Sequence, residues 1–393
     1  MTIIAFMAEP FYKEGDNFLS SKASINFVNK CFENEEVVCV GSQISTKPLA
    51  VSSIIRSDYF EVVPEYKSIL DFSIRSLKNP FYFFNYIKRC NQILDKYPDA
   101  MVWARNPSIG PVLFSICAIV KKRILFNHLC ANGMKAWDNV KYTGGRRVLA
   151  YLFSHCLTLM VKYISKSKRT LNLCTGSELE FFCKEHNTNT CQFIDSNILN
   201  IKKIIKDRNK SSPLQFLFIG RVQEDKGIYE LLSAFEELPV DNFTLSVIGN
   251  GEALDELQSK YELSQSITFL GPIPNHLLSS YIDKSDCLIV PSKNKYEGFP
   301  RVILEGWSRS TPVIVSDVGG IHSFVKHMDN ALIYDGSQSK LIEAMKVLKK
   351  EGVLPRLQKG AIEMSELTTE SFWVERAQTG ISKFLSENTW KIK

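Results

Sequence analysis

The stretch that decides the fold runs Cys287-Leu-Ile-Val-Pro-Ser-Lys-Asn-Lys-Tyr-Glu-Gly-Phe-Pro-Arg-Val-Ile-Leu-Glu-Gly-Trp307. Its first four residues are apolar and predict a buried strand, whereas the apolar spacing of its second half predicts a helix. Pro300 lies where this helix begins and suits its first position, N1. A strand, a loop and a helix in this order indicate a parallel α/β sheet.

Two glutamates flank the start of this predicted helix. Glu297 lies on the loop just before it, and Glu305 lies about one and a half turns into it. The amides of Gly298 and Phe299 would face an anionic ligand at the positive end of the helix dipole. A carboxylate accepts hydrogen bonds from two adjacent hydroxyls, so the pair would bind a nucleotide sugar by its ribose and its hexose. By spacing alone, two glutamates eight residues apart also occur by chance.

Two earlier loops follow predicted strands and precede predicted helices. The first carries Gly220, Arg221 and Lys226, and two cations five residues apart at a helix start would hold a diphosphate. The second carries Gly249 in a G-x-G turn, where missing side chains would let a ligand approach the backbone. Taken singly, each loop is equally consistent with an ordinary surface turn.

The whole chain alternates short β-rich runs with longer helical segments, which predicts an α/β fold with two parallel sheets. The polar, lysine-rich segment 200–213 is the predicted linker. We therefore expect domains at 1–200 and 201–364, with a helix from about 365 to 393 packing back on the first domain. The predicted strands are 2–8, 37–41, 101–104, 123–127, 171–174, 191–194, 214–219, 244–248, 267–270, 287–290, 312–316 and 331–334.

Charge is distributed unevenly along the 393 residues. Residues 1–210 hold 29 Lys and Arg against 18 Asp and Glu, and residues 101–170 alone hold 12 basic residues against one acid. Such a segment suits an anionic membrane surface or a phosphate-bearing acceptor. Because the chain has no zinc-finger, RNP or other nucleic-acid motif, we expect no nucleic-acid partner.

Membrane spans, secretion and metal sites are not expected. The longest nearly uncharged apolar stretches, 111–120 and 148–161, fall short of the roughly 18–20 residues of a membrane span. The N-terminus reads as a strand rather than a signal peptide. The ten cysteines contain no C-x-x-C pair and predict free thiols in a reducing compartment. Segment 146–169 is an apolar helix with cationic ends, which predicts either a membrane-facing helix or a buried one.

These motifs together resemble the retaining GT-B glycosyltransferases of glycosyltransferase family 4, also called glycosyl transferases group 1. The resemblance covers about 214–334 and includes the G-R-x4-K-G loop, the G-x-G-E turn and the E-x7-E signature. It implies a GT-B fold with two Rossmann-like domains facing a central cleft, the first binding the acceptor and the second a nucleotide-diphosphate sugar. By that resemblance Arg221 and Lys226 neutralise the diphosphate, Glu297 contacts the transferred sugar, and Glu305 contacts the ribose.

The first half resembles the family in architecture only. His128 follows the predicted strand 123–127, so we expect its ring to face the cleft. The family often has a histidine near the transferred sugar at a comparable place, and a satisfied structural histidine is the alternative. Lys13, Gly15 and Asn17 follow the first strand and would shape the acceptor mouth, unless that loop is merely solvated.

The resemblance implies sugar transfer with retention of anomeric configuration. The chain contains no D-x-D motif, so we expect no divalent metal and no cofactor. We expect a lipid-diphosphate-linked glycan as acceptor, in O-antigen, capsule or exopolysaccharide synthesis by a cytoplasmic enzyme peripheral to the inner membrane. The alternatives are a nucleotide-sugar epimerase of the same fold and a degenerate glycan-binding scaffold. The epimerase would need paired acids near C2 of the sugar, and the scaffold would lose its donor-loop charges, which are present.

Overall fold

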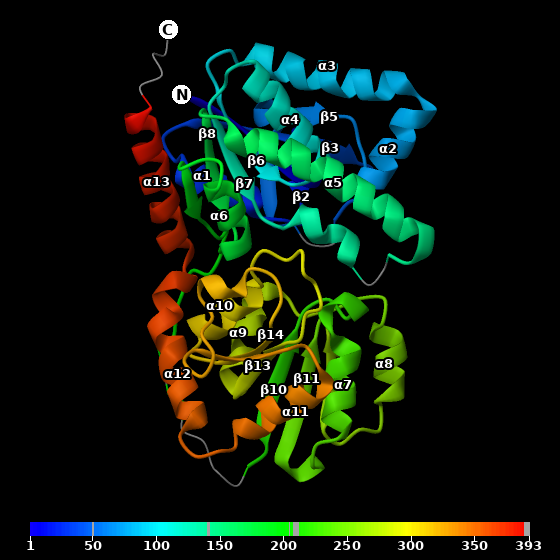
Figure 1. The fold of residues 1–393 in the computed structure, drawn as a ribbon, viewed down its shortest axis with the longest axis vertical. Coiled ribbons are helices and arrows are strands. Elements are labelled where there is room, and N and C mark those ends of the chain that lie inside the picture. Colours follow the sequence, from blue (N-terminus) through cyan, green and yellow to red (C-terminus); the bar gives the residue numbers. More distant parts are fainter. Residues whose placement is uncertain (49–50, 140–141, 204, 207–211, 389–393) are drawn as a thin grey trace. The chain divides into compact units, whose positions relative to one another are not determined.

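The computed structural model describes residues 1–48, 51–139, 142–203, 205–206 and 212–388. The chain divides into two compact units, shown in Figure 1. Unit 1 comprises Met1–Trp137, Gly144–Asp195 and Trp373–Lys393, and unit 2 comprises Asp138–Thr143 and Ser196–Phe372. The predicted linker 200–213 falls partly outside the described residues. That unit 1 binds the acceptor and unit 2 the donor stays a prediction.

Unit 1 is built on a nine-stranded sheet. Seven strands are parallel, in the order β5-β3-β1-β6-β7-β8-β9, and β2 and β4 extend β1 in antiparallel pairing. The central strands are buried on both faces, which explains their continuous apolar sequence. The strands are β1 (Thr2–Glu14), β2 (Asn17–Ser20), β3 (Glu36–Ile44), β4 (Ser53–Arg56), β5 (Phe60–Val63), β6 (Met101–Asn106), β7 (Leu125–Leu129), β8 (Thr170–Cys174) and β9 (Thr190–Gln192).

Helices cover both faces of this sheet. Apolar residues of α3 to α6 form one core cluster with alternate residues of β1, β6 and β7. On the other face, Phe27 of α1 and Trp373 of α13 pack against Phe193, and Phe32, directly after α1, packs against Trp103. The helices are α1 (Ser24–Cys31), α2 (Ile69–Lys78), α3 (Pro80–Lys96), α4 (Ile109–Val120), α5 (Gly144–Lys166), α6 (Ser177–Lys184) and α13 (Glu370–Glu387), which belongs to unit 1 from Trp373 onward.

The first strand differs from its predicted extent of residues 2–8. A bulge shifts the register between Phe6 and Pro10, with Ala8 at a φ of 56°, and β1 then continues to Glu14. Lys13, Gly15 and Asn17 therefore lie at the tip of the β1–β2 hairpin, with Glu14 opposite Asn17. The predicted end of the first strand at residue 8 is wrong, because the bulge lets pairing resume beyond that residue.

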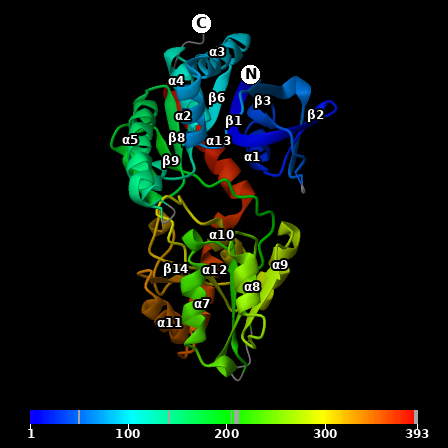
Figure 2. The same cartoon turned by 90° about the vertical axis from the view of Figure 1, so that its right-hand side faces the viewer.

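Helix α5 is longer than the apolar stretch 148–161, whose length led us to expect no membrane span. It has 23 residues and is apolar enough to cross a membrane by length and composition, with 28% of its most apolar window buried. Figure 2 shows it at the outside of unit 1. Leu157, Val161 and Ile164 pack into the core, whereas Leu152 and Leu159 are more than half exposed. One face of this helix is thus buried and the other is exposed, and that the exposed face meets a membrane stays a prediction.

Unit 2 is a six-stranded parallel sheet in the order β12-β11-β10-β13-β14-β15. Residues of α7, α8 and α11 form a core cluster with alternate strand residues. The strands are β10 (Leu214–Ile219), β11 (Phe243–Ile248), β12 (Ile267–Gly271), β13 (Cys287–Val290), β14 (Val313–Ser316) and β15 (Ala331–Tyr334). The helices are α7 (Ile228–Glu236), α8 (Leu254–Lys260), α9 (Asn275–Lys284), α10 (Arg301–Ser308), α11 (Gln338–Val347) and α12 (Val353–Met364).

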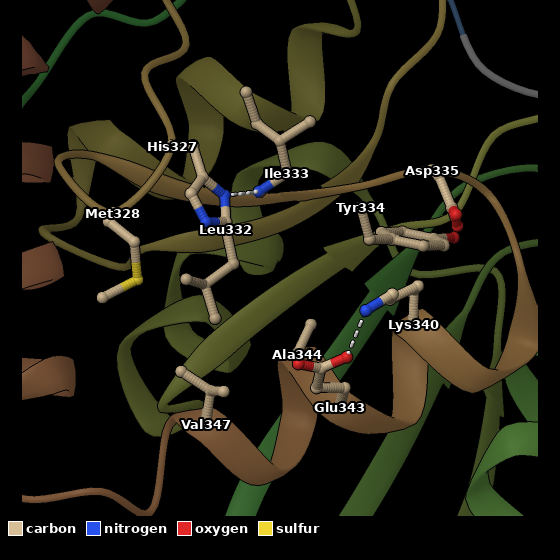
Figure 3. A pocket seen from close by; sticks show the side chains of 10 residues that line it. All are labelled: His327, Met328, Leu332, Ile333, Tyr334, Asp335, Lys340, Glu343, Ala344 and Val347. Atoms are coloured by element: carbon tan, nitrogen blue, oxygen red, sulfur yellow. Dashed lines mark hydrogen bonds and ion pairs between the residues drawn. The ribbon is translucent and has the colours of Figure 1, made fainter.

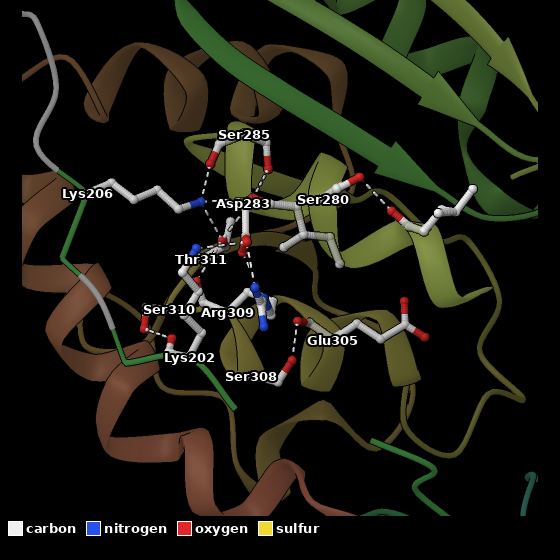
Figure 4. A network of polar contacts seen from close by, with 12 residues as sticks. Lys202, Lys206, Ser280, Asp283, Ser285, Glu305, Ser308, Arg309, Ser310 and Thr311 are labelled. Atoms are coloured by element: carbon white, nitrogen blue, oxygen red, sulfur yellow. Dashed lines mark hydrogen bonds and ion pairs between the residues drawn. The ribbon is translucent and has the colours of Figure 1, made fainter. Parts of the chain in front are cut away.

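A polar network fixes the start of unit 2, as Figure 4 shows. The Lys206 ammonium donates to the carbonyl oxygens of Ile282 and Ser285 at 2.8 and 2.5 Å and to Thr311 Oγ1 at 2.7 Å. Burial lowers the pKa of Lys206 to about 8. Carbonyls at the C-terminal end of α9 are thereby capped by a cation, so this network has a structural role.

The cysteines are free thiols, as predicted, and seven of the ten are buried. Cys156 of α5 is exposed. The buried cysteines act as small apolar core residues, so their number needs no disulfide or metal site to explain it.

Candidate functional site

The strand order of unit 2 marks a place for a ligand. From β10 the chain proceeds outward through β11 and β12, and it then returns to the other side of β10 for β13, β14 and β15. In open α/β sheets, ligands bind outside the carboxyl ends of the strands at this reversal. The loops after β10 and β13 meet there, and they carry most of the predicted donor residues.

Lys226 and Glu297 form an ion pair between these two loops. The Lys226 ammonium lies 2.8 Å from both carboxylate oxygens of Glu297, and Ser292 Oγ donates to Glu297 Oε2 at 3.2 Å. Their side chains are 19% and 24% exposed, so the pair is reachable from solvent. Sequence reasoning identified both charges but missed Ser292, whose only signal is its place directly after a strand and a proline.

Arg221 is more exposed than expected of a residue that grips a ligand. Its side chain is 55% exposed and lies 3.4 Å from Asp225 Oδ2. Asp225 Oδ1 is buried and has no hydrogen-bond partner among the described residues. Both predicted cations are therefore paired with carboxylates in this structure. A diphosphate would have to replace those carboxylates or bind beside them, and Asp225 was not predicted.

The glycines of these loops are required by close packing of backbone. Gly249 has a φ of 144°, and a Cβ there would lie 1.8 Å from the carbonyl oxygen of Gly220. A Cβ on Gly227 would lie 1.9 Å from the carbonyl oxygen of Pro291. The predicted reason for Gly249 is thus corrected, because the neighbouring loop and not a ligand takes the room left by its missing side chain.

The start of α10 differs slightly from the prediction. The helix begins at Arg301, so Pro300 occupies the N-cap and not the N1 position. Phe299 is 4% exposed, and its ring packs against Trp307 and Phe324. Gly298 accepts a hydrogen bond from the amide of Gly320 at 2.9 Å. The side chain of Phe299 is therefore a core residue, and its amide alone remains a candidate for ligand binding.

Glu305 lies in the second turn of α10. Its Oε2 is buried and has no hydrogen-bond partner among the described residues. Burial raises the pKa of this carboxyl, and the charge of Arg301 opposes the rise. Figure 4 shows its side chain pointing away from the Lys206 network. An unpaired buried carboxylate oxygen is costly for folding, which makes Glu305 a strong candidate for a ligand contact.

His128 does not lie beyond its strand. It is the fourth residue of β7, is 1% exposed, and packs edge-on against Trp103 and Phe193. Burial lowers the pKa of its imidazole to about 3, so the ring is neutral at pH 7. Neither ring nitrogen has a hydrogen-bond partner among the described residues. The ring is thus neither exposed at a strand end, as expected, nor a satisfied structural histidine.

A separate hollow of unit 2 lies between β15 and α11 (Figure 3). Its volume is about 330 Å³, and its floor includes Leu332 and Val347. At its rim, Lys340 pairs with Glu343 at 2.8 Å, and His327 Nδ1 accepts from the amide of Ile333 at 3.0 Å. The predicted donor residues are not among its lining, so this hollow is separate from the candidate site.

The candidate site offers cations, hydroxyls and carboxylates and is suited to a phosphorylated sugar. Lys226 supplies a positive charge for a phosphate, while Glu297 and Glu305 accept hydrogen bonds from hydroxyls. In the described part of the chain, no group of three or more His, Cys, Asp or Glu side chains is placed to hold a metal ion.

Residues 200–363 match the protein family described as Glycosyl transferases group 1. Within that stretch lie the ion pair of Lys226 and Glu297 and the buried Glu305. TuaC of Bacillus subtilis (strain 168), named as a teichuronic acid biosynthesis glycosyltransferase, is 33% identical over 129 residues. That match covers 33% of this chain and 31% of TuaC. The chain thus spans less than a third of that relative.

Solved structures resemble the chain over nearly its whole length. HepE of Anabaena, crystallised with UDP and with UDP-glucose, matches with a TM-score of 0.64 at 14% and 15% identity, covering 98% of this chain and all of HepE. WaaG, a glycosyltransferase involved in lipopolysaccharide biosynthesis, matches with a TM-score of 0.62 at 14% identity, covering 95% of this chain and 98% of WaaG. The chain therefore has the GT-B fold.

Proposed function

We propose that this chain is a retaining glycosyltransferase. It transfers a sugar from a nucleotide-diphosphate sugar to a lipid-diphosphate-linked oligosaccharide, in the synthesis of a bacterial surface polysaccharide such as O-antigen, capsule or exopolysaccharide. The family match of residues 200–363 supports the activity class. The crystals of HepE with UDP and UDP-glucose support a nucleotide sugar as donor. TuaC and WaaG support the polysaccharide context by their names.

The observation that carries the proposal is the ion pair of Lys226 and Glu297 at the strand reversal of unit 2. A bound diphosphate would take the Lys226 ammonium as counter-ion and release the Glu297 carboxylate. That carboxylate would then accept hydrogen bonds from the transferred sugar. One binding event would thus neutralise the leaving group and position the sugar. Glu305 would bind the ribose through its unpaired oxygen.

The reaction exchanges one glycosidic bond for another. The bond between the anomeric carbon and the diphosphate oxygen breaks, and an acceptor hydroxyl forms the new bond on the same face of the sugar. The hydroxyl proton passes to the departing phosphate oxygen, so no side-chain nucleophile is needed. Fixed positive charge at Lys226 and Arg221 stabilises the charge that develops on the diphosphate. We therefore propose that neither a divalent metal nor a cofactor is required, and His128 stays a prediction for the sugar site.

The test measures nucleotide release from a panel of UDP-, GDP- and other nucleotide sugars by the purified protein. We expect one of these donors to be turned over, with or without a chelator such as EDTA. With a glycoside acceptor added, the new linkage should keep the donor's anomeric configuration, as measured by NMR. Lys226→Met should lower turnover by about 10²–10³-fold, the effect of removing one preorganised charge-stabilising group. The control is Lys340→Met on α11. Release of nucleotide only when a metal is added would contradict the proposed metal independence.

We also propose that the protein works at an anionic membrane surface, as a peripheral protein on the cytoplasmic side. Helix α5 supports this because it exposes apolar side chains on its outer face, has exposed Arg146 and Arg147 in its first turn and contains no acid. Val148, Leu152 and Leu159 lie along this face at 63%, 55% and 57% exposure. Apolar area together with cations binds a helix in the plane of an anionic bilayer.

A further inference from the structure

Unit 1 carries a hollow of about 540 Å³ at the carboxyl edge of its sheet. Its lining includes Glu9 of β1, Ser42 of β3, Tyr66 after β5 and Ser108 after β6. Strand β1 lies between β3 and β6, so the strand order reverses between β1 and β6, as it does between β10 and β13 in unit 2. By the rule for open α/β sheets, this edge is where unit 1 should take a ligand.

The bulge of β1 places Glu9 in the lining of this hollow. Ala8 has a φ of 56°, which is a strained conformation for a residue with a side chain. Glu9 follows it and is 1% exposed, and neither of its carboxylate oxygens has a hydrogen-bond partner of normal geometry among the described residues. An unpaired buried carboxylate beside a strained bulge indicates a binding function, because both features weaken the fold.

The charges around Glu9 indicate which chemical group it binds. Burial raises the pKa of this carboxyl, and the Ser24 hydroxyl and the charges of Arg105 and Lys22 oppose the rise, while Asp195 adds to it. Arg105 and Lys22 repel a positively charged ammonium group, so such a ligand is disfavoured. The Glu9 carboxylate repels a negatively charged phosphate. Neither objection applies to a hydroxyl group, which donates a further hydrogen bond to Glu9 beside the Ser24 hydroxyl.

The rest of the lining is suited to a sugar. Tyr66 Oη lies 3.0 Å from Ser108 Oγ and accepts a hydrogen bond from the amide of Gly110 at 3.0 Å, so this side of the hollow is preorganised. Ser42, Ser45 and Thr46 add hydroxyls. The hydroxyl groups of a pyranose ring can donate and accept hydrogen bonds with these lining hydroxyls.

We propose that this hollow binds the hydroxyl-bearing sugar of the acceptor and that Glu9 accepts a hydrogen bond from one of its hydroxyls. The proposal rests on the proposed glycosyltransferase function. It moves the acceptor site away from Lys13, Gly15 and Asn17, which lie at the hairpin tip. It also makes Glu9 the residue that selects among acceptor sugars.

The experiment uses the full-length protein and a panel of methyl glycosides of common hexoses, 6-deoxyhexoses and N-acetylhexosamines, with binding followed by saturation-transfer NMR. Glu9→Gln keeps the shape of the side chain but removes its charge. We expect at least one glycoside to bind and Glu9→Gln to weaken that binding at least about tenfold, as for loss of a hydrogen bond to a charged group. Thr46→Trp, at an exposed position of the lining, should also weaken it by filling the hollow.

The matched control is Glu185→Gln, an exposed glutamate of the same unit, which should bind like wild type. Wild-type binding by both Glu9→Gln and Thr46→Trp, or no binding of any glycoside to the wild type, would overturn the proposal. Nucleotide release from the donor panel is measured on the same samples. If it is absent from the wild type while a glycoside binds in a Glu9-dependent way, the proposed transfer reaction fails and the sugar site stands.

Discussion

Single residues decide the chemistry of the candidate site in unit 2 and of the hollow in unit 1, and three of these residues carry buried carboxylate oxygens without a partner. Asp225, Glu305 and Glu9 each hold a carboxylate oxygen that no described residue satisfies. In the folded protein such atoms lose their hydration without replacement, so their presence sacrifices stability. Proteins retain such residues where a ligand uses them. At Asp225, Glu305 and Glu9 we therefore expect a carboxylate that lowers the stability of the fold and serves ligand binding.

This competition gives a prediction for Glu305→Gln. Because burial raises the pKa of Glu305, the unfolded chain releases this proton more readily than the folded one. The wild type should therefore lose stability relative to the variant as pH rises from about 4 through the raised pKa. We expect the variant to have the higher Tm at pH 8 and a Tm close to wild type at pH 4. Nucleotide binding should weaken about tenfold or more.

Thermal denaturation between pH 4 and pH 8, with calorimetric titration of UDP and GDP, measures both effects. Glu256→Gln on the surface helix α8 is the control. A Tm difference that shrinks as pH rises would contradict the assigned direction of the pKa shift.

The glycines of the unit 2 loops give a second prediction at this scale. Gly249→Ala would place a Cβ 1.8 Å from the Gly220 carbonyl oxygen, whereas Gly336→Ala has open space around it although Gly336 also has a positive φ, of 89°. We expect Gly336→Ala to cost about 1–2 kcal/mol, from backbone strain alone. Gly249→Ala should cost clearly more. Urea denaturation of both variants measures this, and equal losses would show that the contact between the loops is unimportant.

At the scale of elements, α5 joins two environments along one helix. Its inner face packs with Leu157, Val161 and Ile164 in the core, and its outer face exposes Leu152, Leu159 and Tyr163. Helix α5 is therefore too apolar in composition for an ordinary surface helix, and its side chains are too exposed for a core helix. A membrane interface accounts for both the apolar composition and the exposure, because apolar side chains can enter it from a helix that stays packed on its own protein.

We predict that Leu152→Glu with Leu159→Glu weakens binding to vesicles of 30% phosphatidylglycerol in phosphatidylcholine at least tenfold, measured by sedimentation. The acids both remove apolar area and add repulsion. Leu263→Glu, at a position of unit 2 that is 95% exposed, is the matched control and should bind as wild type. Binding that is unaffected by raising the salt concentration or by removing the anionic lipid would contradict the electrostatic part.

At the scale of the whole molecule, the chain returns to its first unit at the end. From Trp373 onward, α13 belongs to unit 1, where Trp373 packs edge-on against Phe193 and Gln378 Nε2 donates to the carbonyl oxygens of Lys30 and Cys31. Unit 1 is therefore made of segments that are far apart in sequence. Such a unit is complete only when the last helix has been synthesised.

Trp373→Ala tests this dependence. Trp373 is fully buried, and removing its ring should cost about 3–5 kcal/mol. We expect faster amide hydrogen exchange in the strands of unit 1 and unchanged exchange in those of unit 2. Phe181→Ala, an exposed ring of the same unit at 69% exposure, should change neither. Faster exchange confined to unit 2 would mean that α13 stabilises the other unit instead.

The sequence by itself determined the strands of unit 2 and the charged residues of its loops. Strands 214–219, 287–290 and 331–334 have their predicted bounds, because a short apolar run between turn residues specifies a buried strand locally. Lys226, Glu297 and Glu305 were identified in the same way, from their places beside predicted strands and helices. The sequence of each short segment was sufficient to predict these features.

Only the tertiary structure decided which of these groups meet. The pairing of Lys226 with Glu297 depends on β10 lying next to β13, although 71 residues separate the two side chains. The bulge at Ala8, the hairpin that carries Lys13 and the burial of Glu9 and His128 likewise depend on strand pairing and packing. Apolar periodicity carries no information on strand order or on bulges, because both are set by contacts between segments distant in sequence.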